Sequence, residues 1–281
     1  MNFIEFNDVS FTYPAVEGDL DENGKQIVPA PIYDHFSGTL PGGFTSIIGP
    51  NGCGKSTLML IASGRIIPQN GKVLVAGKDI ASLDENQKNL LASIIYQNME
   101  FESTEKVEEL LSFVYKNGAL KGNAKAINSD RDLFAEVVDV FELAPVMNHG
   151  LTEISKGENQ RVLLAFSILY GSASIFMDEP LFAMEFYQKE NALQYLKDFS
   201  KKTGTAIYIS MHELELTRKY AENVLLIHPN RDMSLGTPEE VMTNDELEKA
   251  YGIPVVMLKH NENMTRETLT AQAEALKNSQ K

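Results

Sequence analysis

The chain has 281 residues, of which 43% are hydrophobic and 23% are charged, an ordinary composition for a globular protein. Its 39 acidic and 25 basic residues give a net charge of −14, which argues against a general affinity for nucleic acid, because such binding needs a basic surface. No apolar run approaches the roughly 20 residues that span a bilayer, and the N-terminus does not predict a signal peptide. The single cysteine excludes an internal disulfide, which suits a reducing cytosol.

Segments with strand and helix character alternate along the chain. Aromatic and β-branched residues and short apolar runs predict strands at 3–13, 43–49, 71–80, 91–98, 174–178, 205–210 and 223–228. Helical patterns predict a helix over 55–65 and a mainly helical interval from 102 to about 168. Residues 17–31 predict an exposed excursion, in which Asn23-Gly24 is suited to a hairpin turn. This alternation predicts an α/β fold with a mainly parallel sheet and helices on both faces.

The segment GPNGCGKST at 49–57 follows a predicted strand and opens a predicted helix. Gly49, Gly54, Lys55 and Ser56 match the pattern G-x-x-x-x-G-K-[ST], in which the lysine reaches the β- and γ-phosphates of a nucleotide and the hydroxyl binds Mg²⁺. Glycines let successive N–H groups face one anion, and the helix N-terminus adds its positive dipole end. The alternative is a glycine-rich turn without a ligand, which the strand–loop–helix context disfavours. The predicted ATP-binding residues here are Gly49, Pro50, Asn51, Gly52, Cys53, Gly54, Lys55, Ser56 and Thr57.

The apolar segment SIFMDEP at 174–180 ends in two acids. Asp178 at the end of the strand can hold Mg²⁺ through water. Glu179 would then point at the γ-phosphate, where a carboxylate can polarise the attacking water. Taken alone, a solvated acidic turn explains the pattern equally well. A phosphate loop upstream favours the catalytic interpretation.

The segment ISKGENQRV at 154–162 makes a family resemblance specific. With the two preceding motifs it resembles the ATP-binding cassette (ABC) family, whose diagnostic stretch reads leucine-serine-glycine-glycine-glutamine. Ser155 and Gly157 match that stretch, whereas Lys156 and Glu158 depart from it. The resemblance implies that Ser155, Gly157 and Glu158 bind ATP held by a second subunit. A capping box formed by Ser155 and Glu158 is the simpler interpretation, and the two are compatible.

Further positions match the family in order. Gln97 resembles the glutamine that contacts Mg²⁺ and links the site to the helical lobe, and His212 resembles the histidine that contacts the γ-phosphate. Tyr13 resembles the aromatic residue that stacks on adenine. Each also has a purely structural explanation. Gln97 can be a solvated residue at a strand end, His212 can cap a helix, and Tyr13 can fill the core. Glu185 stands where the family usually has aspartate, in a loop that communicates across a dimer.

The resemblance implies an α/β P-loop ATPase core of the RecA-like kind, with an antiparallel β region. An α-helical subdomain is expected at about 99–170, inserted within an ATPase domain of residues 1–258, and a polar tail is expected at 259–281. ATP and Mg²⁺ are the implied ligands. The implied catalytic residues are Lys55, Gln97, Glu179 and His212, and the implied metal ligands are Ser56, Gln97 and Asp178.

The end of the match, from 220 to 255, resembles the branch that serves iron-chelate and cobalamin importers, as does GPNGCGKSTL. We therefore expect a transporter ATPase that is cytoplasmic and peripheral on the inner face of the cell membrane. Two copies joined by ATP would drive a separate membrane subunit that imports an iron chelate or a similar metal complex. Two alternatives stay open: a soluble ABC ATPase acting on the ribosome or DNA, and a regulatory module that binds ATP without hydrolysing it.

Overall fold

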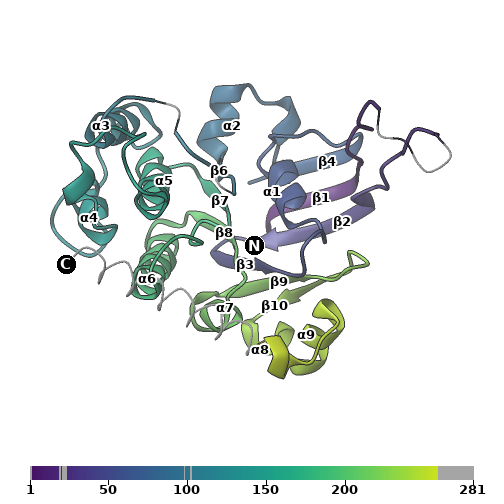
Figure 1. Ribbon diagram of the computed structural model, residues 1–281. Coiled ribbons are helices and arrows are strands. Elements are labelled where there is room, and N and C mark those ends of the chain that lie inside the picture. Colours follow the sequence, from purple (N-terminus) through teal and green to yellow (C-terminus); the bar gives the residue numbers. More distant parts are fainter. Residues whose placement is uncertain (1, 19, 21–23, 98, 102, 259–281) are drawn as a thin grey trace.

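The computed structural model describes residues 2–18, 20, 24–97, 99–101 and 103–258 (Figure 1). The expected polar tail at 259–281 lies outside the described residues, and so does Asn23 of the expected hairpin turn. Across the described ranges, no helix combines the length and the apolar character needed to cross a membrane.

A four-stranded antiparallel sheet forms the antiparallel region expected from the resemblance. Its strands are β1 (Asn2–Phe11), β2 (Tyr33–Pro41), β4 (Asn70–Val75) and β5 (Lys78–Asp79), in the order β2-β1-β4-β5. The excursion between β1 and β2 is largely exposed where it is described, and its pairing there is one isolated antiparallel bridge, between Leu20 and Gln26.

A six-stranded, mainly parallel sheet forms the second layer. Its strands are β3 (Phe44–Ile48), β6 (Ala92–Ile95), β7 (Ser174–Asp178), β8 (Ala206–Ser210), β9 (Asn223–Ile227) and β10 (Met233–Gly236). The order is β10-β9-β3-β8-β7-β6, and every neighbouring pair is parallel except β9 with β10. All residues of β3, β7 and β8 are buried, as expected for parallel strands covered on both faces. The predicted α/β fold class is confirmed.

The helices surround this sheet. They are α1 (Lys55–Ala62), α2 (Glu85–Leu91), α3 (Val107–Asn117), α4 (Leu133–Val140), α5 (Lys156–Tyr170), α6 (Phe186–Thr203), α7 (Leu214–Tyr220), α8 (Pro238–Val241) and α9 (Asn244–Tyr251). Two short 3₁₀ helices cover Ile80–Ser82 and Ala144–Val146. Between β6 and β7 the chain forms α3, α4 and α5, which lie on the side of the molecule away from the antiparallel sheet (Figure 1).

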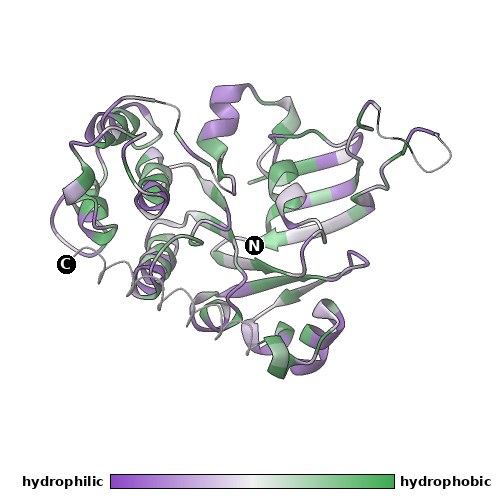
Figure 2. Ribbon diagram, in the orientation of Figure 1, coloured by the Kyte–Doolittle hydropathy of each residue, from purple (hydrophilic) through white to green (hydrophobic). Residues whose placement is uncertain are grey.

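Side chains of β7 enter the core on both faces of the parallel sheet. Ile175 and Met177 pack with residues of α5 and α6, whereas Phe176, between them, packs with residues of α1 and of the antiparallel sheet. Figure 2 shows the strands of the parallel sheet mostly in the hydrophobic colour, while the exposed α2 is mostly hydrophilic. Each of these large buried side chains stabilises the fold by about 1.5–3 kcal/mol.

The parallel pairing brings four strand ends to one edge. β6, β7, β8 and β3 are consecutive neighbours in the sheet. Because parallel strands all end at the same side, the segments that follow these four strands meet there, which is where α/β sheets place their ligands.

Candidate active site

The loop between β3 and α1 has the curled backbone that the sequence predicts. Gly49, Gly52 and Gly54 have φ angles of +148°, +78° and +111°, which side-chain-bearing residues rarely adopt. A Cβ atom on Gly49 would lie 2.4 Å from the carbonyl oxygen of Ile227, so the loop begins in close contact with the end of β9. Gly54 is the N-cap of α1 and provides no side-chain cap, which leaves the amides of the first turn open to an anion.

Lys55 closes this loop on itself. Its side chain is buried, and Nζ donates hydrogen bonds to the carbonyl oxygens of Gly49, at 2.9 Å, and Pro50, at 3.1 Å. Of the other predicted loop residues, the two with side chains that face solvent are Asn51 and Ser56. Cys53 is buried beneath the loop, and its burial raises the pKa of the thiol.

Tyr13 lies beside the phosphate loop. Its hydroxyl is 3.1 Å from Oγ1 of the buried Thr57, and its ring meets that of Phe11 edge-on, with 4.9 Å between the ring centroids. Tyr13 is 40% exposed, so part of its ring stays accessible. Stacking on adenine stays a prediction.

Asp178 and Glu179 are arranged by a residue that the sequence analysis missed. Ser210, at the end of β8, pairs in register with Asp178 at the end of β7. The Ser210 hydroxyl donates to Oδ1 of the buried Asp178, at 2.6 Å, and accepts from the backbone N–H of Glu179, at 2.9 Å. The sequence contains a signal for this contact, because two predicted strands end in Asp178 and Ser210. Neighbouring parallel strands bring the side chains at their ends together.

The Glu179 carboxylate joins the ends of three strands. Gln97, after β6, donates from Nε2 to Oε2 of Glu179, at 2.9 Å. His212, after β8, places Nε2 2.6 Å from Oε1 of the same carboxylate. Glu179 has a φ of +50°, a left-handed conformation that costs a residue with a side chain about 1–2 kcal/mol. Backbone strain of this kind is characteristic of functional sites.

Ser155 begins α5 with a capping box. Its hydroxyl accepts from the backbone N–H of Glu158, at 3.3 Å, and its own N–H donates to Oε2 of Glu158, at 2.8 Å. Hydrogen bonding to the side chain and to the backbone N–H of Ser155 lowers the pKa of the Glu158 carboxyl group. The simpler interpretation therefore holds within this chain.

The first turn of α5 also holds two loops that the sequence analysis did not connect. The buried Asn159 donates from Nδ2 to the carbonyl oxygen of Met99, at 2.8 Å, shortly after Gln97. Gln160 accepts from the backbone N–H of Ala183, at 2.9 Å. A Cβ on Gly157 would lie 2.7 Å from the carbonyl oxygen of Ala183, so this close approach requires glycine. The start of α5 thus contacts the segments that follow both Gln97 and Glu179.

Glu185 is connected to the helical lobe. It precedes α6, and its N–H donates to Oε1 of Gln188, at 3.2 Å. Gln188 in turn donates from Nε2 to Oε2 of Glu142, after α4, at 2.8 Å. Arg161 of α5 donates to the Glu142 carbonyl oxygen, at 3.1 Å. Residue 185 therefore joins a hydrogen-bonded connection between its loop and the end of α4 through its backbone N–H, which does not depend on the length of its side chain.

Within one chain, the residues at the start of α5 that are predicted to bind ATP lie apart from the phosphate loop. One edge of the parallel sheet carries the phosphate loop together with Gln97, Asp178, Glu179 and His212. Ser155 and Gly157 belong to α5, which Figure 1 shows apart from α1. Among the described residues, no hydrogen bond joins α5 to the phosphate loop.

The family model described as ABC transporter matches residues 35–182. A hemin import ATP-binding protein, HmuV of Rhizobium meliloti strain 1021, is 30% identical over 221 residues, which cover 75% of this chain and 82% of that protein. The petrobactin import ATP-binding protein FatE of Bacillus anthracis is 26% identical over 220 residues, which cover 77% of this chain and 86% of FatE.

Solved structures of low sequence identity share the fold. The ATP-binding cassette MJ0796, in a dimeric post-hydrolysis state with ADP and Pi, superposes with a TM-score of 0.67 at 21% identity, over 84% of this chain and 98% of that one. The cbiO1 protein of Clostridium perfringens, part of the cbiONQ transporter complex, gives a TM-score of 0.65 at 20% identity, over 88% and 92% of the two chains.

Proposed function

This chain belongs to the ABC transporter family, and from that premise we propose that it is the ATP-binding and ATP-hydrolysing subunit of an importer. It powers the uptake of an iron chelate or a similar metal complex through a separate membrane subunit. The observation that carries the proposal is the hydrogen-bonded group of Gln97, Glu179 and His212, at the sheet edge that also bears the phosphate loop. The cargo class rests on the relatives, whose names specify the import of hemin and petrobactin.

The phosphate loop binds the ATP phosphates. The uncapped first turn of α1 and the glycine backbone supply N–H donors for the phosphate oxygens. Lys55 exchanges its two carbonyl partners, Gly49 and Pro50, for the β- and γ-phosphate oxygens. Since Lys55 is already buried at the loop, the exchange needs only a movement of its side-chain end.

Glu179 accepts a proton from the water that attacks the γ-phosphate. Its left-handed backbone turns the side chain toward Gln97 and His212, whose hydrogen bonds orient the carboxylate. Ser210 fixes the backbone of Glu179 and the side chain of Asp178 at the same time. Positioning accounts for much of the catalysis in phosphoryl transfer, and this arrangement supplies it.

The residues present fit a Mg²⁺ ion. Asp178 is a carboxylate that is only 6% exposed, and a hydroxyl partner orients one of its oxygens. The described part of the chain contains no cluster of three or more His, Cys, Asp or Glu side chains suited to a metal. Mg²⁺ does not need one, because it keeps several waters and binds to substrate phosphates with one or two carboxylates. Ser56, Gln97 and Asp178 would hold the ion, which when bound neutralises charge on the phosphate oxygens.

We expect Lys55→Ala to weaken ATP binding by about 10- to 100-fold, because hydrogen bonds to a charged group are each worth about 1.5–3 kcal/mol. Isothermal titration with ATP and Mg²⁺ measures the change. Lys219→Ala is the control, since Lys219 is an exposed lysine that pairs with Glu190 outside the site. Unchanged ATP affinity in a folded Lys55→Ala protein would remove Lys55 from the phosphate site.

A second copy of the chain completes each site. The phosphate loop surrounds the phosphates from one side. Ser155 and the backbone amides near Gly157 provide further donors, and within the described chain no hydrogen bond links them to its own phosphate loop. Two copies arranged head to tail about a two-fold axis place these donors on each other's γ-phosphate. ATP therefore joins the copies, and ADP, which lacks the γ-phosphate, releases them.

The helical lobe carries the membrane contact. The segment after Gln97 leads into α3 and is held by Asn159, so a change at the γ-phosphate is transmitted to the lobe. Phe113 on α3 is 65% exposed, which suits contact with another protein. The chain is cytoplasmic and is held at the inner face of the membrane through this partner.

We expect cysteines introduced at Glu108 and Phe113, both exposed on α3, to cross-link to the membrane subunit in native membranes. The only native cysteine, Cys53, is buried, so its reaction contributes little background. Glu239→Cys on α8 is the control, because α8 and α3 lie at opposite ends of the molecule (Figure 1). Efficient cross-linking from position 239, with none from α3, would refute docking through the lobe.

The same membranes test the cargo. Vesicles that contain the complex should accumulate ⁵⁵Fe supplied as a chelate when ATP is present on the side of this subunit. If the complex hydrolyses ATP but accumulates no iron chelate, the proposed ATPase activity stands and the proposed cargo class is rejected.

A further inference from the structure

Helix α9 contacts the beginning of the phosphate loop. The backbone N–H of Gly49 donates a hydrogen bond to the hydroxyl of Tyr251, the last residue of α9, at 3.1 Å. This contact joins positions 202 residues apart in the chain. Because α9 lies beyond residues 35–182, this contact is not part of the match to the family model.

The position of α9 is fixed by both its apolar and its polar side chains. Leu247 and Ala250 are buried in a cluster that also contains Ile48, the residue before Gly49. On the polar side, Nε2 of His228 lies 3.4 Å from Oε2 of Glu246, and Lys249 donates to Oε1 of the same carboxylate, at 2.9 Å.

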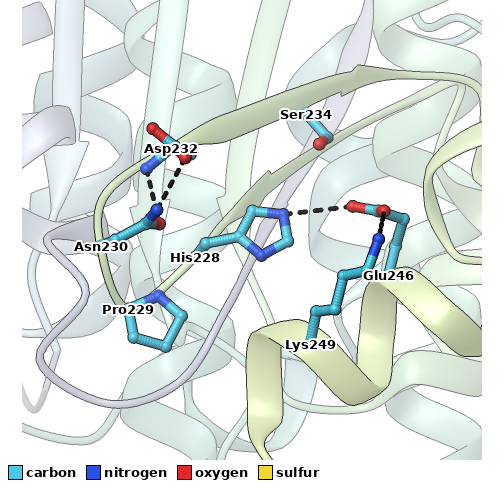
Figure 3. A pocket seen from close by; sticks show the side chains of 7 residues that line it. All are labelled: His228, Pro229, Asn230, Asp232, Ser234, Glu246 and Lys249. Carbon is cyan, nitrogen blue, oxygen red and sulfur yellow. Dashed lines mark hydrogen bonds and ion pairs between the residues drawn. The ribbon is translucent and has the colours of Figure 1, made fainter.

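These polar groups line a pocket of about 520 Å³ between α9 and the loop after β9 (Figure 3). In Figure 3, Glu246 and Lys249 extend from the helix toward His228 and the loop. Within the described residues, the ionisable side chains of the pocket are these three and Asp232, which accepts from Asn230. The contact between Glu246 and His228 connects α9 to the residue after β9, the strand against which Gly49 packs.

Gly49 is thus held on both sides of its α-carbon. Its N–H bonds to Tyr251, and its carbonyl oxygen accepts from Lys55. In the proposed function, Lys55 gives up the second bond when it turns to the phosphates, whereas the first bond does not involve Lys55. Once Lys55 has turned away, the hydrogen bond to the Tyr251 hydroxyl keeps Gly49, the first glycine of the loop, in its conformation with a φ of +148°.

We propose that Tyr251 is a positioning residue for the nucleotide, which keeps the start of the phosphate loop in its binding conformation through the N–H of Gly49. This inference rests on the proposed function of the loop. Tyr251 contacts the loop through the backbone N–H of Gly49, so it acts on nucleotide affinity and not on the chemical step. The effect is the same for ATP and ADP, because the contact lies at the start of the loop and not at the γ-phosphate.

The test is Tyr251→Phe, which removes one oxygen atom and retains the ring. Loss of one hydrogen bond of this kind corresponds to about a fivefold weaker affinity. We expect the Kd of both ATP and ADP, and the KM for ATP, to rise about fivefold, with kcat at saturating ATP within twofold of wild type. Tyr220→Phe is the matched control, since its hydroxyl donates to Glu190 on α6, outside the loop.

Amide hydrogen exchange at Gly49 provides a second measurement that does not depend on activity. We expect faster exchange in Tyr251→Phe than in wild type or in Tyr220→Phe. Unchanged nucleotide affinity, or equal losses in both Tyr→Phe variants, would overturn the role of Tyr251. A lower kcat at unchanged KM would overturn it as well. Failure of the wild-type chain to bind ATP would instead reject the proposed function.

Discussion

Glu179→Gln should bind ATP with nearly wild-type affinity and hydrolyse it at least about 100-fold more slowly, since a positioned general base contributes about 10²–10⁴-fold to such a rate. The amide is almost the same size as the carboxylate and cannot take up the proton of the attacking water. The substitution also places an NH₂ group where one carboxylate oxygen stood, so at most one of the contacts with Gln97 and His212 keeps an acceptor oxygen.

Phosphate release at saturating ATP and Mg²⁺ measures the rate, and isothermal titration measures the affinity. The control is Glu215→Gln, the same chemical change at an exposed position in the first turn of α7. Near-normal turnover in Glu179→Gln would remove Glu179 from the water-activating role. Absence of turnover in the wild-type chain would support the regulatory module that binds ATP without hydrolysing it.

Ser155→Arg should abolish most of the ATP hydrolysis and leave the affinity of the single chain for ATP within about threefold. The arginine would fill the space that the proposed second copy's γ-phosphate needs, while the phosphate loop of the same chain is untouched. We expect turnover to fall at least about tenfold, since an anion site of this kind contributes about 10²–10³-fold when it stabilises developing charge.

Loss of the helix cap has to be separated from loss of the shared site. Ser155 caps α5 together with Glu158, and replacing such a cap costs about 1 kcal/mol of stability. Thr237→Arg is the matched control, because Thr237 and Glu240 form the same capping box at the start of α8. If Thr237→Arg lowers turnover as much as Ser155→Arg, the effect is one of stability and not of the shared site.

The motifs and the fold class could be predicted from the sequence because each rests on a local pattern. The phosphate loop needs its glycines within a few residues, and the buried strands of the parallel sheet are apolar over their whole length. Strand β2 was not predicted, since most of its residues are exposed or half-buried and it shows no clear alternation. Helix α9 was missed although Thr243 and Gly252 mark its two ends.

Contacts that depend on strand register could not be predicted in the same way. The resemblance implies that Gln97 contacts Mg²⁺, and the motif places Glu179 at the γ-phosphate, but their direct hydrogen bond follows from β6 and β7 being neighbours. The role of Ser210 depends on its pairing with Asp178 across β7 and β8. The bond between Tyr251 and Gly49 joins two distant parts of the chain through packing of α9, which no local pattern encodes.

The central claim is that ATP joins two copies of this chain, each completing the other's catalytic site. Size-exclusion chromatography with light scattering on Glu179→Gln tests it most directly, because that variant preserves bound ATP. With ATP and Mg²⁺ we predict a particle of twice the 31.2 kDa chain mass, and with ADP the single chain. The double variant with Ser155→Arg should remain a single chain with either nucleotide. A dimer that persists in the double variant, or one that forms equally with ADP, would contradict the account.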